Sequence, residues 1–250
     1  VAFGDVDGDK DLDFIVGTSL AVTEDEGEDG WIVGGSLDGF AVPSPSPSAS
    51  EMGTRGSSNK LLLNNGYLNG YHASMTFTQA ADFPEGFAQT SAVAFGDVDG
   101  DDDLDLLIGN ADGPNEMLIN DGRGGFTSSS GLLAGSGFTK AVAFGDVDGD
   151  NDLDVILGNN YDTTEHIELP NQLLLNDGSG YFTIAATFYN SDDMARTTAV
   201  AFGDLNGDDN IDIIFGNDYA SSKIYLNDGK LYLDDAAPSP SPSPSPSPSP

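Results

Sequence analysis

Short apolar runs alternate with clusters of carboxylates along this chain, and the same order of runs occurs four times. In each copy a Val-Ala-Phe-Gly run, typified by Ser91 to Gly96, alternates small and large side chains and predicts an inner strand at a crowded axis. After the carboxylates, an almost wholly apolar run such as Leu104 to Ile108 predicts a strand buried on both faces. No segment shows a convincing helical period.

Two further strands complete each unit around an Asn-Asp-Gly or Asn-Asn-Gly turn, which is typical of hairpins. The expected third strands lie in 60–66, 116–122, 172–178 and 223–229, and the expected fourth strands include 125–127, 181–183 and 231–233. A sheet of this size is too small to be stable alone, so neighbouring sheets must pack face to face.

A repeat of roughly 50 residues is typical of propellers and related arrays. We therefore predict an all-β fold, a β-propeller-like array of four four-stranded blades, each with an Asp-rich loop. The array spans 1–237, with blades at about 1–90, 91–135, 140–190 and 198–237, a long insertion at 18–58 and a separate Ser-Pro tail at 238–250.

The most specific motif is the nine-residue loop Asp97-Val-Asp-Gly-Asp-Asp-Asp-Leu-Asp105, whose other copies begin at Asp5, Asp146 and Asp204. Carboxylates at this density repel one another, so a folded loop needs a cation at its centre. Side-chain oxygens at positions 1, 3, 5 and 9, with a main-chain oxygen at position 7, suit calcium. Magnesium prefers a smaller octahedral site, and the loops hold no His or Cys for zinc or copper. The alternative is an acidic surface run without an ion, but a solvated face would not repeat Asp, Gly and apolar residues in register.

The formal charge is −34, from 42 acidic and 8 basic residues, and 20 of the acidic residues lie in the four loops. Four calcium ions would still leave the chain strongly anionic, and this field excludes a nucleic-acid binder. The chain has no Cys, so calcium instead of disulfides is expected to cross-link it. No apolar run approaches the length of a membrane span, so we expect no membrane insertion. The chain begins at Val1 inside a repeat, and we expect a processed or excised piece without its targeting segment.

Two Ser-Pro tracts, Pro43–Ser48 and Pro238–Pro250, hold 10 of the 13 prolines. Alternating proline removes every second backbone donor, which forbids helix and sheet and favours polyproline II. The tracts are either disordered linkers or O-glycosylated stalks. On the second reading, the expected modified positions include Ser44, Ser46, Ser48, Ser239, Ser241 and Ser243, with the neighbouring Pro43, Pro45, Pro47, Pro238, Pro240 and Pro242. Ser-Pro alternation resembles the hydroxyproline-rich glycoproteins of extracellular matrix.

Phe-Gly-Asp-Val-Asp-Gly-Asp-x-Asp-Leu-Asp followed by Asn-Asp-Gly resembles the FG-GAP/VCBS repeats, the calcium-bearing blades of integrin α-subunit β-propellers and of many secreted proteins. The resemblance covers about 1–17, 59–66, 92–127, 141–183 and 199–233. Rings of this family usually have seven or eight blades. Four blades leave open a small closed ring, a fragment of a larger ring, or an arc completed by another copy.

The resemblance implies up to four Ca²⁺ ions. The implied side-chain ligands are Asp5, Asp7, Asp9, Asp13, Asp97, Asp99, Asp101, Asp105, Asp146, Asp148, Asp150, Asp154, Asp204, Asn206, Asp208 and Asp212, and main-chain ligands come from Asp11, Asp103, Asp152 and Asn210. Position 6 favours a left-handed residue, which Asp and Asn tolerate better than Lys10, so the first site is expected to be the weakest. Asn206 lowers the charge of the fourth site.

Nothing in the sequence forms a catalytic constellation, and we expect no enzyme activity. The two histidines, His72 and His166, lie in insertions and are expected on the surface. The leading hypothesis is an extracellular calcium-binding structural or adhesive glycoprotein of a matrix, surface appendage or fibre, with O-linked glycans and other copies of itself, or matrix glycans and proteins, as partners. A protein- or glycan-binding propeller head, with Trp31 as a contact, is the alternative. A calcium-dependent polysaccharide-processing enzyme is disfavoured because no basic cluster is available for an acidic sugar.

Overall fold

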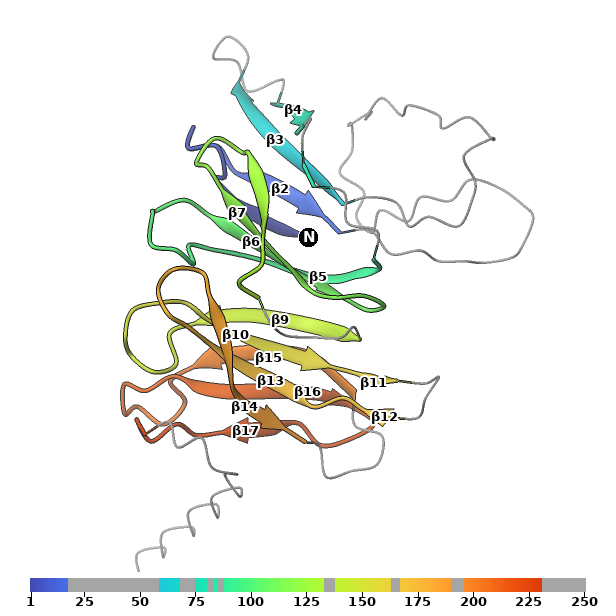
Figure 1. Ribbon diagram of the computed structural model, residues 1–250, viewed down its shortest axis with the longest axis vertical. Helices are drawn as coiled ribbons and strands as arrows, with labels where there is room; N and C mark the ends of the chain where they lie inside the picture. Colours follow the sequence, from blue (N-terminus) through green and yellow to red (C-terminus); the bar gives the residue numbers. More distant parts are fainter. Residues whose placement is uncertain are drawn as a thin grey trace, which may run out of the picture.

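The computed structural model describes residues 1–17, 59–67, 75–80, 83–84, 88–132, 138–162, 167–189 and 196–230. These residues form antiparallel sheets and contain no helix, so the all-β prediction is confirmed (Figure 1). In the same part of the chain no helix has the length and hydropathy that a membrane crossing requires.

Four sheets follow one another in chain order (Figure 1). The first sheet holds β1 (Ala2–Gly4), β2 (Asp13–Val16), β3 (Lys60–Tyr67) and β4 (Met75–Gln79) in that order. The second holds β5 (Thr90–Gly96), β6 (Asp105–Asn110), β7 (Glu116–Asn120) and β8 (Phe126–Ser129).

The third sheet holds β9 (Thr139–Gly145), β10 (Asp154–Asn159), β13 (Asn171–Asn176) and β14 (Phe182–Phe188), with the small pair β11 (Tyr161–Asp162) and β12 (Ile167–Glu168) between β10 and β13 along the chain. The fourth holds β15 (Arg196–Gly203), β16 (Asp212–Asp218) and β17 (Lys223–Tyr225). The fourth strand predicted at 231–233 and the Ser-Pro tail lie beyond the described residues.

The second strand of each sheet explains why neighbouring sheets stack. All six residues of β6 and all six of β10 are buried. Side chains alternate between the two faces of a strand, so Leu106 and Ile108 join the core shared with the first sheet, and Leu107 joins the core shared with the third. In β10, Ile156 likewise joins the core shared with the fourth sheet. Each such side chain contributes about 1.5–3 kcal/mol by leaving water, which confirms the prediction of strands buried on both faces.

The first strands of successive sheets lie against one another along the array, β1 with β5, β5 with β9 and β9 with β15. The first and fourth sheets stand at opposite ends of this array (Figure 1). The small residues of the Val-Ala-Phe-Gly runs permit this close approach of strands, as the sequence pattern predicts.

The predicted turn at Asn-Asp-Gly is confirmed in the second and third sheets and is wrong in the first. In the second sheet the turn spans Asp121 to Gly125, closed by the Asp121 N–H donating to the Gly125 carbonyl at 3.0 Å and by the Asp121 carboxylate accepting the Gly125 N–H at 3.0 Å. In the first sheet the Asn-Asn-Gly segment lies inside β3, with a register shift between Asn64 and Tyr67. The physical reason is that Asn65 donates to Thr78 Oγ1 across the strands at 2.7 Å, so it does not nucleate the turn as Asp121 does.

At each junction inside the chain, the glycine that ends the first strand of one sheet packs against side chains of the next sheet. A Cβ added to Gly145 would lie 2.7 Å from Phe202 Cδ2, whereas a Cβ on Gly203 would have no atom within 4 Å. Gly145→Ala is therefore expected to destabilise the protein by about 1–3 kcal/mol through overpacking, and Gly203→Ala is expected to leave stability unchanged. Urea denaturation of both variants in calcium measures this difference. Equal unfolding midpoints would contradict the close packing at Gly145.

Candidate metal centre

Each Asp-rich loop joins the first two strands of its sheet and is closed at its base by a backbone pair. The four pairs are Gly4 with Asp13, Gly96 with Asp105, Gly145 with Asp154 and Gly203 with Asp212. Position 1 of the motif therefore follows the first strand directly, and position 9 begins the second. The sheet holds both ends of the motif and brings its carboxylates together.

The Asp at position 1 organises the turn within each loop. Asp97 Oδ1 accepts the N–H of Gly100 at 2.8 Å, and its Oδ2 accepts the N–H of Asp102 at 2.9 Å. The equivalent two bonds occur in the other three loops. Carboxylate oxygens have further lone pairs, so these hydrogen bonds fix the side chain without using up its capacity as a ligand.

Position 6 adopts the left-handed conformation in all four loops, as the sequence predicts. The φ values are 74° at Lys10, 70° at Asp102, 74° at Asn151 and 68° at Asp209. Asp and Asn adopt this conformation with less strain than Lys, because their short polar side chains form local hydrogen bonds. The first loop therefore carries strain that the other three loops largely avoid.

Replacement of Lys10 by glycine is expected to relieve this strain. Lys10→Gly should raise the stability of the calcium-loaded protein by about 0.5–1 kcal/mol and tighten calcium binding at the first loop, because it also removes a positive charge. Calorimetric titration with calcium and thermal unfolding measure the two effects. Asn151→Gly, at the same position of the third loop, is the matched control and should give a smaller gain. A larger gain at Asn151 would count against the strain argument.

The Asp at position 9 is fully buried in every loop. Asp105 Oδ2 accepts the Val98 N–H and its Oδ1 accepts the Asn120 N–H, both at 2.9 Å. Burial raises the pKa of Asp105 and of Asp154 to about 6, against two backbone hydrogen bonds that lower it. A buried charge with a raised pKa is stabilised by a nearby cation, so position 9 is both an anchor of the loop and a candidate ligand.

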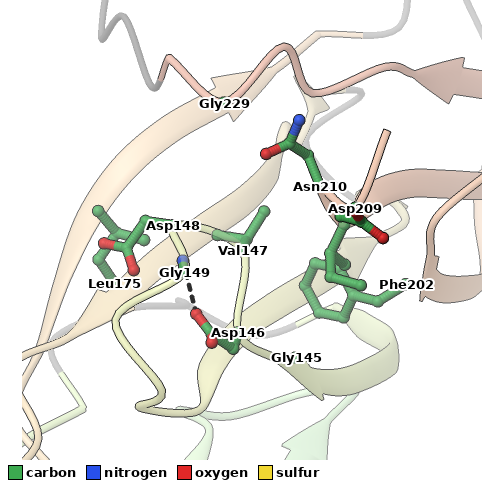
Figure 2. Close-up of a pocket in the computed structure, with 11 residues that line it drawn as sticks. Gly145, Asp146, Val147, Asp148, Gly149, Leu175, Phe202, Asp209, Asn210 and Gly229 are labelled. Carbon is green, nitrogen blue, oxygen red and sulfur yellow. Dashed lines mark hydrogen bonds between the residues drawn. The ribbon is translucent and has the colours of Figure 1, made fainter. Parts of the chain in front are cut away.

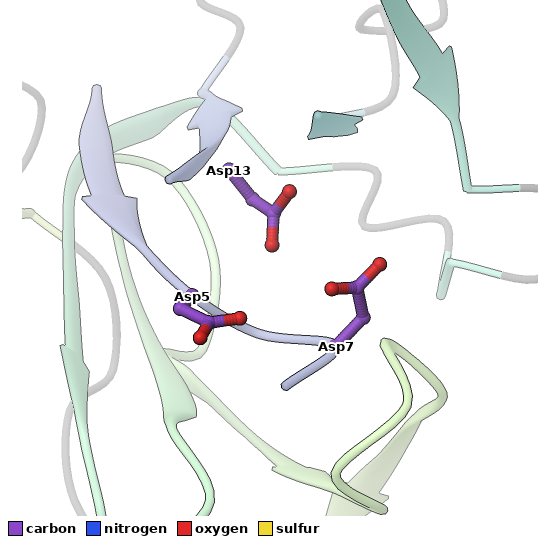
Figure 3. Close-up of side chains that lie close together, drawn as sticks. All are labelled: Asp5, Asp7 and Asp13. Atoms are coloured by element: carbon purple, nitrogen blue, oxygen red, sulfur yellow. The ribbon is translucent and has the colours of Figure 1, made fainter. Parts of the chain in front are cut away.

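Three loops bring carboxylate oxygens within 4.8 Å of one another. The groups are Asp5, Asp7 and Asp13 in the first loop (Figure 3), Asp97, Asp99 and Asp101 in the second, and Asp146, Asp148 and Asp154 in the third. Each group offers three oxygen ligands within reach of one ion. All nine residues are among the predicted ligands, and the set differs between loops because position 9 belongs to the group in only two of them.

The electrostatics of these groups fit a hard cation. Burial, followed by repulsion from neighbouring carboxylates, raises the pKa of Asp7, Asp99 and Asp148. Asp99 Oδ1 is buried and has no hydrogen-bond partner in the described structure. A buried oxygen without a partner is costly, and a cation bound among Asp97, Asp99 and Asp101 would satisfy it.

The fourth loop differs at position 3, where Asn206 replaces Asp. Its Oδ1 accepts the Asp208 N–H at 2.9 Å and its Nδ2 donates to Asp208 Oδ2 at 3.0 Å. Hydrogen bonds, that from the Gly207 N–H foremost, lower the pKa of Asp204, and the Asn210 N–H lowers that of Asp208. Hydrogen-bond donors within the fourth loop thus stabilise its negative charge. This loop therefore depends less on a bound cation than the other three loops do.

Positions 5 and 7 take separate roles. Asp9, Asp101, Asp150 and Asp208 at position 5 each accept the N–H of the residue at position 7, at 2.9–3.0 Å. At position 7, the side chains of Asp103, Asp152 and Asn210 lie against Gly122, Gly178 and Gly229 in their own sheets. Asp11 occupies position 7 of the first loop. Side chains engaged with the neighbouring turn agree with the expectation that this position contributes its main-chain oxygen.

One set of contacts to the loops was not predicted from the sequence. Asn120 Nδ2 donates to the Val6 carbonyl at 2.9 Å, Asn176 Nδ2 to the Val98 carbonyl at 2.8 Å, and Asn227 Nδ2 to the Val147 carbonyl at 2.7 Å. Each bond joins a sheet to the Asp-rich loop of the preceding sheet. We call these three residues the asparagine clasps. Their signal in the sequence is an Asn that recurs at the end of every Leu-rich run, where the turn motif by itself accounts for it.

A cavity of about 690 Å³ lies between the third and fourth loops (Figure 2). Asp146 and Asp148 line it from the third loop, Asn210 lines it from the fourth, and Leu175 and Phe202 supply apolar walls. The cavity therefore combines oxygen ligands with an apolar surface, next to the candidate metal groups.

Several predicted positions lie outside the part of the chain that the structure describes. They are the Ser-Pro positions Pro43, Ser44, Pro45, Ser46, Pro47, Ser48, Pro238, Ser239, Pro240, Ser241, Pro242 and Ser243, together with Trp31, His72 and His166. Their assignments stay predictions.

Comparison with known families identifies the central part of the chain. A family model described as FG-GAP-like repeat matches residues 97–157, from the start of the second Asp-rich loop to β10. Residues 97–157 are FG-GAP-like repeat sequence. The match confirms the resemblance over these residues, and the first and fourth units share the same loop motif outside the matched segment. No curated protein matches the chain.

Proposed function

We propose that this protein is an extracellular calcium-binding structural or adhesive glycoprotein, in which ions stiffen FG-GAP-like blades and the Ser-Pro segments carry O-linked glycans. The observation that carries the proposal is the gathering of three carboxylates within 4.8 Å in each of three loops. Each of these loops joins the first two strands of one sheet and contacts the next sheet through an asparagine clasp. An ion in the loop would therefore stiffen both its own blade and the junction with the next.

Calcium is the cation that the ligand chemistry favours. The candidate ligands are oxygens, and calcium accepts six to eight of them in flexible geometry, whereas magnesium demands a tight octahedron. Extracellular calcium-binding modules have dissociation constants of about 10⁻⁴–10⁻³ M, which suits sites open to millimolar calcium. FG-GAP repeats are typical of extracellular proteins, which supports this location.

The partners follow from the same reasoning. The charge of −34 disfavours nucleic acid, and we propose O-linked glycans, other copies of the chain and matrix glycans or proteins instead. We propose a structural or adhesive role and no enzymatic one, because the sequence offers no catalytic constellation. The cavity between the third and fourth loops supports a second candidate function, a propeller head that binds a protein or glycan through an ion.

Electron microscopy of the native material, imaged in calcium and again after chelation, tests the proposal. A structural role predicts ordered fibres that loosen in chelator and are restored by calcium but not by equal magnesium. Dispersed particles in both conditions would contradict the structural role and favour the binding head. Direct calcium titration of the same material should show binding in either case, so an absence of calcium binding would reject both candidates.

A further inference from the structure

The contact between neighbouring sheets has the same two halves at each junction inside the chain. The preceding sheet contributes a glycine, and the following sheet contributes the Phe of its Val-Ala-Phe-Gly strand. At the first two junctions the apolar residue at position 8 of the following loop joins this Phe. A Cβ on Gly4 would lie 2.7 Å from Leu104 Cδ1 and 3.3 Å from Phe95 Cδ2. A Cβ on Gly96 would lie 2.9 Å from both Leu153 Cδ1 and Phe144 Cδ2. Only glycine leaves room for the next sheet.

The first sheet presents the apolar half of this contact to solvent. Phe3 is 66% exposed and Leu12 is 62% exposed, whereas their counterparts Phe95 and Leu104 are half-buried against Gly4. Phe3 and Leu12 occupy the same two positions of the first unit. Their counterparts in the second and third units pack together against a single glycine of the preceding sheet. We call them the apolar face.

The fourth sheet presents the glycine half of the contact. A Cβ on Gly203 would have no atom within 4 Å, and one on Gly216 would contact only Ala199 of its own sheet. The equivalent of Gly216 in the third sheet, Gly158, contacts Val200 and Thr197 of the next sheet. At position 2 of the loop, Leu205 is 47% exposed, whereas the equivalent Val6, Val98 and Val147 are 1%, 1% and 4% exposed. We call Gly203, Leu205 and Gly216 the glycine face.

We propose that the apolar face of one copy docks onto the glycine face of a second copy of this chain. The chain already makes this contact between each pair of neighbouring sheets, and the two faces are its unpaired halves. Their shapes are expected to be complementary, because the same residue types fit together at the junctions inside the chain. Phe3 and Leu12 would pack against Gly203 of the second copy, as Phe144 and Leu153 pack against Gly96. They would also cover Leu205 of the second copy. Two copies joined at both faces would close a ring of four plus four blades, within the range of roughly 4–8 blades found in propellers.

Charge makes this docking depend on calcium. Each copy carries −34, so two ion-free copies repel one another, and ions bound in the Asp-rich loops reduce that repulsion. In this respect the inference rests on the proposed calcium binding. Head-to-tail contacts of this kind form a ring if the rotation closes and a filament if it does not. Both outcomes use the same two faces.

Sedimentation velocity of the full 250-residue chain in about 10 mM calcium, well above the expected dissociation constants, tests the docking. The chain should form dimers or longer assemblies as its concentration rises. Phe3→Ser removes part of the apolar face, and Gly203→Leu fills the glycine face at a position where a Cβ meets no atom within 4 Å in the single copy. Each variant should weaken association at least about tenfold, as loss of a central contact does. Tyr189→Ser, at a residue 67% exposed just after β14, is the matched control and should associate as the unaltered chain does.

Mixing the two variants gives a sharper test. Phe3→Ser keeps its glycine face and Gly203→Leu keeps its apolar face, so an equimolar mixture should form a complex through one intact junction, although neither variant associates alone. The proposal is overturned if the unaltered chain stays monomeric, whether its own residues or another blade of a longer protein cover the faces. It is also overturned if both variants associate normally. Calcium titration of Phe3→Ser, whose change lies outside the Asp-rich loops, should show unchanged binding, which separates failure of docking from failure of the calcium proposal.

Discussion

Removal of calcium is expected to lower the melting temperature of this protein by about 10 °C or more. A ligand that binds only the folded state stabilises it by RT ln(1 + [L]/Kd). At about 10 mM free calcium and dissociation constants of about 10⁻⁴–10⁻³ M, each site contributes about 1.4–2.7 kcal/mol. Three occupied loops therefore contribute about 4–8 kcal/mol, and one kcal/mol corresponds to roughly 2–4 °C in a chain of this size.

The ion-free loops provide the structural reason for this effect. Burial raises the pKa of Asp105 and Asp154 to about 6, so their ionised forms destabilise the fold at neutral pH until a cation is bound. Thermal unfolding followed by circular dichroism, in calcium, in chelator and in equal magnesium, measures the shift. Magnesium should restore only part of the stability, because the open carboxylate groups suit a larger ion. A melting temperature unaffected by chelation would reject calcium as the cross-link of the fold.

The sequence predicts most of the fold because period-two burial is directly visible in it. The apolar run of β6 indicates burial on both faces, and Leu106 and Leu107 do pack into different cores. The Asp-rich loops are equally predictable, because residue types within the loop determine their backbone. The left-handed φ at position 6 and the hydrogen bonds that the Asp carboxylate at position 1 accepts from backbone N–H groups both involve residues of the same loop.

Features that depend on contacts between strands or between sheets could not be predicted in the same way. The Asn-Asn-Gly segment of β3 has turn chemistry, yet Asn65 pairs with Thr78 and the strand continues. Asn176 belongs to an Asn-Asp-Gly turn motif, but the carbonyl to which its side chain donates, that of Val98, lies 78 positions away along the chain. A local motif indicates the local backbone, whereas the contact of Asn65 follows from the pairing of β3 with β4 and the contact of Asn176 follows from how the sheets stack.

The asparagine clasps lead to the second large effect: Asn176→Ala is expected to destabilise the protein by about 3–4 kcal/mol. Asn176 is buried, and its Nδ2 donates to the Val98 carbonyl at 2.8 Å and the Leu153 carbonyl at 3.3 Å. Its Oδ1 accepts the Gly180 N–H at 3.1 Å. Removing the side chain leaves these buried backbone groups unsatisfied, at about 1–3 kcal/mol each before relaxation. Urea denaturation in calcium measures the loss.

The same substitution should also act at a distance within the array. Val98 is position 2 of the second Asp-rich loop, so loss of the clasp in the third sheet should weaken calcium binding at the second loop, which calorimetric titration detects. Asn176→Asp keeps the shape but offers carboxylate oxygens to two carbonyl oxygens, and should destabilise at least as much as Asn176→Ala. Ser179→Ala, in the same turn but exposed, is the control and should change stability by less than about 0.5 kcal/mol. If both Asn176 variants unfold at the urea concentration of Ser179→Ala, the clasps do not couple the blades, because a buried donor that joins two sheets cannot be removed without cost.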